Sequence, residues 1–319
     1  MPDRTAVSTR PRTAAASGRS PSPDRRRVRL EIVIAPALAL VCTLAAGPAR
    51  HVQAQLVSER ETIRAGEPFW VGLHLRMAPG WHTYWKNPGD SGLPTRLRWT
   101  LPADFQAGPI QWPYPRAFSQ GPVTSYGYED EVLLPVKITP PASLAAGEVT
   151  LAARADWLEC QEACIPGRAE LSLVLPVRAA AAPPSPAWAP AFADARRRLP
   201  AEPAGWAFGA QEMPQKVWLV FRPPRSRVPL KDARFFPDQP LVIDHAAPQP
   251  LSRGKGAWRL ELTPAPNARR PLPALSGVLV IGGAGGQNEA VRVEARILDA
   301  GGLKMAGGGQ RPPAQEGKR

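Results

Sequence analysis

The sequence is poor in the residues that most often hold metal ions. It contains four histidines and three cysteines among 319 residues. After residue 54 only His74, His82 and His245 remain, and none lies at a metal-site spacing from the cysteines. We therefore expect no bound metal and no other cofactor.

Long apolar runs are also missing from most of the chain. Beyond residue 54 no apolar stretch approaches 18 residues, so we expect the mature protein to meet a membrane only transiently, through a partner. Lysine and arginine outnumber the acidic residues by 40 to 27, which gives a formal net charge of +13. The basic residues are scattered instead of forming one face with interleaved aromatic residues, and this argues against nucleic-acid binding.

Residues 1–54 have the features of a leader with a secretory signal peptide. A cluster of arginines at 25–29 precedes an apolar run of fifteen residues, Ile32–Ala46. Small residues follow, and Val52–Ala54 offers a cleavage site before Gln55. The apolar run is shorter than the roughly 20 residues of a comfortable membrane span. We predict export across the cytoplasmic membrane, with an uncleaved N-terminal anchor as the alternative.

The rest of the chain has the composition and periodicity of a β protein. The 40 prolines and 27 glycines argue against long helices. Apolar and polar residues alternate with period two in several short segments separated by turn-forming clusters, at 69–76, 97–101, 149–153 and 171–177. Many short strands with regular turns predict an all-β fold, with an antiparallel β-sandwich over residues 55–178.

A second, smaller β-rich domain is expected after a Pro/Ala linker at 179–190. It should cover residues 191–299, begin with a short helix at 192–199, and be followed by a disordered tail at 300–319. The expected strands lie at 216–222, 240–244, 256–263, 277–281 and 290–298. The glycine-rich segment 282–286 lies between two of them, which predicts a hairpin turn and not a phosphate-binding loop.

Cys160 and Cys164 are the only cysteines after the predicted signal peptide. A disulfide between them would close a loop of about five residues and stabilise the fold by roughly 2 kcal/mol, against about 4.7 kcal/mol for a 100-residue loop. Such a local bond is better suited to being opened and closed than to reinforcing the fold. A purely structural disulfide in a binding or scaffold module remains the alternative.

The expected position of the two cysteines limits their chemistry. They flank a turn between two strands, where their Cα atoms can approach closely enough for a disulfide. A strand lacks the helix N-terminus that lowers the thiol pKa in other redox motifs, and nearby Glu159 and Glu162 would disfavour a thiolate. We expect a disulfide that a partner's thiolate attacks, although the spacing does not indicate which sulfur is attacked.

Two further expectations concern the surroundings of the cysteines. Aromatic side chains that could shield them are Phe118, Tyr126, Tyr128 and Trp157, of which Trp157 is equally well explained as core. Two thiolates would also suit Cu(I), which keeps copper handling open, but the methionines and histidines form no visible copper site.

Three separated motifs resemble one protein family. They are residues 80–92 (GWHTYWKNPGDSG), 126–132 (YGYEDEV) and 157–166 (WLECQEACIP). Together they resemble the N-terminal periplasmic domain of DsbD-type disulfide reductases, especially the branch associated with suppression of copper sensitivity. The resemblance covers roughly residues 55–180, and it implies an immunoglobulin-like fold. The first motif has no obvious chemistry of its own and is interpreted as a packed, turn-rich element.

The resemblance also implies roles for particular residues and partners. Cys160 and Cys164 would be the redox pair that passes electrons to periplasmic acceptors, and the segment 118–128 resembles the region of a cap loop that covers them. Family members usually continue into a membrane domain and a thioredoxin-like domain, which this sequence does not show. The expected partners are therefore thioredoxin-like periplasmic proteins or a separately encoded membrane reductase.

Overall fold

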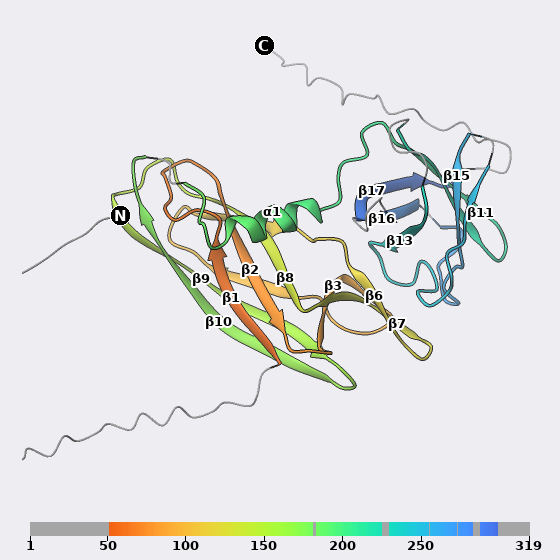
Figure 1. The fold of residues 1–319 in the computed structure, drawn as a ribbon, viewed down its shortest axis with the longest axis horizontal. Helices are drawn as coiled ribbons and strands as arrows, with labels where there is room; N and C mark the ends of the chain where they lie inside the picture. Colours follow the sequence, from red (N-terminus) through yellow and green to blue (C-terminus); the bar gives the residue numbers. More distant parts are fainter. Residues whose placement is uncertain are drawn as a thin grey trace, which may run out of the picture. The chain divides into compact units, whose positions relative to one another are not determined.

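The computed structural model describes residues 51–180, 183–224, 230–254, 256–272, 274–282 and 288–298. These residues belong to one compact unit, Gly47–Arg319. Most of the predicted signal peptide, residues 283–287 of the glycine-rich turn and the predicted tail lie outside the described residues. Strands dominate the described part of the chain, which contains one α-helix (Figure 1), so the expected all-β fold is confirmed.

The first β domain is an antiparallel sandwich of two sheets. One sheet has the order β1-β2-β8-β5, formed by Val52–Ser58, Phe69–Met77, Glu131–Thr139 and Gln106–Ile110. The other has the order β10-β9-β3-β7-β6, formed by Cys164–Val177, Gly147–Cys160, His82–Gly89, Val123–Glu129 and Arg116–Gln120, and β4 (Arg96–Thr100) pairs with β9. The immunoglobulin-like sandwich expected from the sequence is therefore present.

Period-two alternation explains how the two sheets enclose a core. In β2, Val71, Leu73 and Leu75 are fully buried, and Leu134 and Val136 of the neighbouring β8 join them. Side chains at every second position of a strand point to the same face, so each strand contributes a row of apolar residues to the space between the sheets.

The helix expected at 192–199 spans Ala189–Arg197 as α1, with Pro190 in its first turn, where a proline is tolerated. Its buried Phe192 and Ala195 pack against Val57 and Leu133 of the first sandwich. Figure 1 shows α1 lying across β1, β2 and β8. The sequence-based boundary assigned this helix to the second domain, whereas its apolar face covers the first.

The second β domain consists of two antiparallel sheets with a core cluster between them, and its Phe236, Val278, Val280 and Ala290 also join the core cluster of the first sandwich. One has the order β11-β12-β15-β14, formed by Ala207–Glu212, Val217–Arg222, Trp258–Leu262 and Leu251–Arg253. The other has the order β13-β16-β17, formed by Ala233–Pro237, Ala274–Gly282 and Asn288–Arg296. Strands β11, β13 and β14 were not expected from the sequence.

The predicted strand at 240–244 is wrong. Leu241 adopts a left-handed backbone conformation, with φ of 59°, which a regular strand does not contain. The segment forms turns, and Ile243 makes only an isolated bridge with Pro264. Ile243 is nevertheless buried in the second core, so its apolar character reflects burial and not strand pairing.

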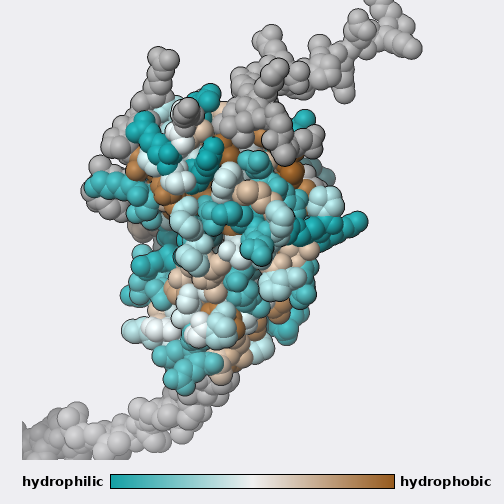
Figure 2. All heavy atoms as spheres, turned by 90° about the vertical axis from the view of Figure 1, so that its right-hand side faces the viewer, coloured by the Kyte–Doolittle hydropathy of each residue, from teal (hydrophilic) through white to brown (hydrophobic). Residues whose placement is uncertain are grey.

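Within the described residues, no helix has the length and apolar character needed to cross a membrane. The face of the molecule seen in Figure 2 is mostly hydrophilic, with small groups of hydrophobic residues between the polar ones.

Strand β1 begins inside the segment that the sequence assigned to the leader. Val52 is 1% exposed and lies opposite Met77, and Gln53 and Ala54 continue the same pairing with β2. Cleavage before Gln55 would remove these three residues from the sheet.

We therefore predict that the exported protein keeps residues 52–54, with cleavage before His51. Mass spectrometry of the mature N-terminus tests this. A variant that lacks residues 52–54 should lose about 2 kcal/mol of unfolding free energy, because burial of one valine side chain is worth about that much. A mature protein that begins at Gln55 with unchanged stability would contradict the prediction.

Candidate functional site

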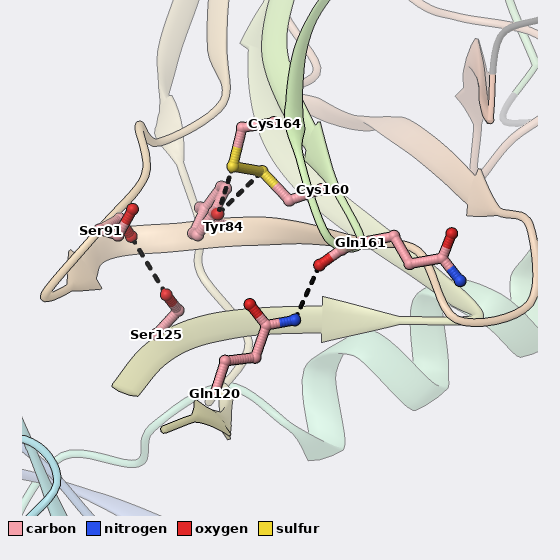
Figure 3. The surroundings of a disulfide bond; sticks show 7 residues. All are labelled: Tyr84, Ser91, Gln120, Ser125, Cys160, Gln161 and Cys164. Atoms are coloured by element: carbon pink, nitrogen blue, oxygen red, sulfur yellow. Dashed lines mark hydrogen bonds between the residues drawn. A yellow bond between two sulfur atoms is a disulfide. The ribbon is translucent and has the colours of Figure 1, made fainter. Parts of the chain in front are cut away.

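The two cysteines close the end of the β9–β10 hairpin. Cys160 is the last residue of β9, Cys164 is the first of β10, and the two lie directly opposite each other. They form a disulfide, with Gln161–Ala163 as the turn between them (Figure 3). The pairing of Cys164 with Cys160 begins β10 seven residues before the alternating segment 171–177 that the sequence indicated.

The two halves of the disulfide differ in accessibility. Cys160 is 2% exposed, whereas Cys164 is an exposed residue. A thiolate from another molecule therefore has freer access to Cys164. This arrangement favours attack on Cys164, with Cys160 as the sulfur that leaves.

The alternation of the strands decides which side chains meet the disulfide. His82 lies opposite Cys160, and Tyr84 follows two residues later on the same face. Gly127 lies opposite Tyr84 on β7, so Ser125 and Val123 share this face, and Phe118 lies opposite Ser125 on β6. These strands enclose a pocket of about 240 Å³ that the disulfide helps to line.

Tyr84 is the side chain in closest polar contact with the disulfide. Its hydroxyl lies 2.9 Å from Cys160 Sγ, to which it donates, and 3.3 Å from Cys164 Sγ (Figure 3). Burial raises the pKa of the Tyr84 hydroxyl above its ordinary value, so the group stays protonated at neutral pH. It can therefore donate a hydrogen bond to a thiolate that forms on either cysteine.

The β6–β7 hairpin covers the pocket from the side. Phe118 stacks on His82 with ring centroids 5.0 Å apart, and burial lowers the pKa of His82, which favours its neutral form. Gln120 Nε2 donates to the Gln161 carbonyl oxygen at 2.8 Å, which joins this hairpin to the turn between the cysteines (Figure 3). Phe118, Gln120, Val123 and Ser125 of the segment 118–128 line the pocket, and its role as a cap stays a prediction.

The other proposed shielding residues point into the core. Tyr126, Tyr128 and Trp157 are at most 4% exposed and belong to one core cluster, which also contains Phe236 of the second β domain. Tyr126 and Tyr128 alternate with Ser125 and Gly127, so they lie on the opposite face of β7 from the pocket. Of the four aromatic residues singled out from the sequence, only Phe118 lines the pocket.

The two glutamates near the cysteines also lie in different surroundings. Glu159 is 3% exposed on the core side, where Trp157 Nε1 donates to its carboxylate at 3.3 Å. It does not line the disulfide pocket, whereas Glu162 does. The Glu159 carboxylate therefore points away from the disulfide pocket, and of the two glutamates only Glu162 lies beside the sulfurs in that pocket.

Sequence reasoning missed Tyr84 and His82, which lie in the motif 80–92 that was interpreted as structural. The alternation within that motif was the available signal. His82 and Tyr84 occupy one face, while Thr83 and Trp85, both fully buried, occupy the other.

The same motif continues into a loop whose Gly92 lies close against the Tyr84 ring. A Cβ atom added to Gly92 would lie 2.2 Å from the Tyr84 ring, and Gly92 has a φ of 111°, so glycine is required there. Asp90 accepts a hydrogen bond from the Thr124 amide at 2.8 Å, and Ser125 Oγ donates to the Ser91 carbonyl oxygen at 3.3 Å (Figure 3).

The second β domain contacts both the end of β3 and the loop that follows it. Asn87 Nδ2 donates to the Pro237 carbonyl oxygen at 2.8 Å, and His245 Nδ1 lies 3.0 Å from Asp90 Oδ1. His245 is 2% exposed, and its ring packs against Tyr126 with centroids 4.9 Å apart. The loop that supports Tyr84 is therefore fastened to both β domains.

Among the described residues, no group of three or more His, Cys, Asp or Glu side chains is arranged to hold a metal ion.

Comparison with known proteins supports the resemblance seen in the sequence. Residues 53–176 match the family described as "Thiol:disulfide interchange protein DsbD, N-terminal". These residues form a DsbD-type N-terminal domain. The matched segment contains strands β2 to β9 and all of β10 except its last residue, and so includes the disulfide and Tyr84.

A solved structure shares the fold of the DsbD-type domain and the region after it. The N-terminal periplasmic domain of ScsB from Proteus mirabilis aligns with a TM-score of 0.57 at 19% identity, covering 78% of this chain and 95% of that one. Spo0M from Bacillus subtilis aligns with a TM-score of only 0.21 at 11% identity, covering 77% and 91% of the two chains, which is too low to carry an argument. No curated protein matches the sequence. The family match and the disulfide of the DsbD-type domain fit thiol–disulfide exchange in general.

We predict that Tyr84→Phe slows reduction of the disulfide by dithiothreitol about tenfold. The leaving thiolate would lose a hydrogen bond, and one to a charged group is worth roughly 1.5–3 kcal/mol. The matched control is Tyr128→Phe, because the Tyr128 hydroxyl donates to the Pro113 carbonyl oxygen at 2.7 Å on the core side. Equal rates for Tyr84→Phe and the unmodified protein would show that the hydroxyl does not assist the exchange.

We predict that His245→Ala lowers the unfolding free energy by about 2 kcal/mol, because Asp90 loses a buried hydrogen-bonding partner. Chemical denaturation of His245→Ala, Asp90→Asn and the double variant measures the coupling, which should be about 1 kcal/mol. Strictly additive effects would mean that the two side chains do not stabilise each other.

Proposed function

We propose that this chain is a periplasmic thiol–disulfide exchange module that relays electrons through Cys160 and Cys164. The observation that carries the proposal is the pairing of an exposed Cys164 with a buried Cys160 under the Tyr84 hydroxyl. A disulfide used only to reinforce the fold needs neither an accessible sulfur nor a hydrogen-bond donor at the other.

The exchange proceeds in two steps. A thiolate of a thioredoxin-like partner attacks Cys164 Sγ and forms a mixed disulfide, while the S–S bond breaks and Cys160 leaves as a thiolate. The Tyr84 hydroxyl hydrogen-bonds that thiolate. The partner's second thiolate then attacks the partner's own sulfur in the mixed disulfide and releases Cys164. The partner dithiol is oxidised by two electrons, the chain is reduced, and both cysteines take up protons.

The expected partners are thioredoxin-like periplasmic proteins or a membrane reductase. Support comes from the DsbD-type match and from the ScsB structure, which is that of a periplasmic domain. The surroundings of the disulfide agree with an attacked disulfide rather than an attacking thiol, because it lies on a β-hairpin without a helix N-terminus to lower a thiol pKa.

Mixed-disulfide trapping tests the proposal and the order of attack. A thioredoxin-like protein without its resolving cysteine, its remaining thiol activated as a mixed disulfide with thionitrobenzoate, is incubated with single-cysteine variants. We expect Cys160→Ser, which keeps Cys164, to form the covalent complex at least tenfold faster than Cys164→Ser, because Cys164 is the exposed residue. The double variant is the control. Failure of both single variants to form a complex would refute the relay.

The reduction potential separates a relay from a structural bond. Equilibration with glutathione buffers should give a value between about −180 and −270 mV, whereas a value below about −300 mV would identify a structural disulfide.

A further inference from the structure

The face that carries the disulfide continues along the β9–β10 hairpin as a single strip. Side chains opposite each other on paired strands share a face, and this repeats every second residue. The Cys160–Cys164 pair is followed on this face by Leu158 opposite Pro166 and then by Asp156 opposite Arg168. A partner that reaches the exposed Cys164 therefore also lies over these residues.

Strand β4 widens the strip into a groove. It pairs with the other side of β9, with Arg96 opposite Asp156 and Arg98 opposite Arg154. The groove has a volume of about 570 Å³, and Leu93, which is 57% exposed, lies at its edge. Its surface thus combines an apolar part, next to the cysteines, with a charged part further along the hairpin.

The charged part holds more positive than negative charge. Asp156 is shared by three guanidinium groups, Arg168 Nε at 2.8 Å, Arg154 Nη2 at 3.2 Å and Arg98 Nη1 at 3.5 Å. Hydrogen bonds from Arg168 and Arg154 hold the pKa of Asp156 below its ordinary value, so it is ionised at neutral pH. The other nearby acid, Glu170, is 75% exposed and lies 4.0 Å from Arg154. With Arg96, four arginines face two carboxylates.

These arginines keep donors for another molecule. Each guanidinium has five N–H donors, and the two oxygens of Asp156 cannot accept all the donors of three arginines. The side chains of Arg98 and Arg168 are each 60% exposed. An arginine fork binds a carboxylate through two parallel hydrogen bonds, which makes acidic side chains the matching ligand.

We propose that this groove is a docking surface for acidic side chains that flank the reactive thiol of a thiol–disulfide exchange partner. The distance supports a protein partner, because four residues along a strand place the Asp156–Arg168 pair about 13 Å from the cysteines. A surface that reaches both also covers the apolar Leu158–Pro166 pair between them, which a free anion would leave uncovered. The inference rests on the proposed function, and it further specifies that the partner carries negative charge beside its reactive thiol.

Three synthetic dithiol peptides test the groove. Each contains Cys-Gly-Pro-Cys, flanked on both sides by aspartates, by serines or by lysines, and each reduces the protein disulfide while its own dithiol is oxidised. At low ionic strength we expect the aspartate peptide to react about tenfold faster than the lysine peptide, and added salt should shrink this ratio. The double variant Arg98→Gln/Arg168→Gln should lose most of the ratio.

A matched variant separates the groove from the net charge of the protein. Arg64→Gln/Arg197→Gln removes the same charge from two exposed arginines outside the groove, each paired with an acid as Arg98 and Arg168 are. It should keep the full ratio. Uncharged dithiothreitol should reduce all variants equally, which confirms that the disulfide itself is unchanged.

The outcomes distinguish this inference from the proposed function. If all three peptides reduce the protein at one rate, or if both double variants lose the ratio equally, the groove proposal is wrong and the exchange function stands. If neither the peptides nor dithiothreitol reduce the disulfide, both proposals fail.

Discussion

The pairing register of β9 with β10 is the constraint on which the site depends. It sets Cys164 opposite Cys160 and, because side chains alternate between faces, it assigns every other residue of the hairpin to the core or to the outer face. Trp157 and Glu159 therefore lie inside, while Leu158 and Asp156 lie outside with the cysteines. A shift by one residue would separate the cysteines and exchange the two faces.

The two cysteines of the disulfide have different surroundings: Cys160 is buried and accepts a hydrogen bond from Tyr84, whereas Cys164 is exposed. Tyr84 reaches the disulfide from β3, and Gly92 in the following loop packs closely against its ring. The end of β3 and that loop are in turn held by contacts of Asn87 and Asp90 with the second β domain. Residues far apart in the sequence thus fix the position of one hydroxyl group. A donor held in advance at the leaving sulfur lowers the cost of reorganisation during the exchange.

The local loop closed by the disulfide favours exchange over reinforcement. A loop of about five residues gives little chain-entropy stabilisation, and the hairpin is already held by the long pairing of β9 and β10. Breaking the bond should therefore remove little of the stabilisation of the sandwich, which suits a protein that cycles between oxidised and reduced forms. The DsbD-type match of residues 53–176 agrees with this view.

Much of the fold was predictable because period-two alternation and turn residues are local properties. The strands around 69–76 and 171–177 and the cysteine hairpin follow from them. The predictions that were wrong concern segments whose local pattern fits more than one structure. The segment 240–244 is apolar because Ile243 is buried, yet Leu241 has a turn conformation, and α1 could not be assigned to a domain before its packing partners were known.

The candidate site, too, was predictable in part from local sequence and in part depended on the tertiary structure. The sequence alone determined the cysteine pair, its strand context and its family resemblance, since these depend on residues close together along the chain. Only the tertiary structure decided that Tyr84 contacts the sulfurs, that Tyr126 and Tyr128 face the core, and that four arginines share the face of the disulfide. Those facts depend on which strands become neighbours and in which register, and strand pairing over such distances is set by the packing of the whole core.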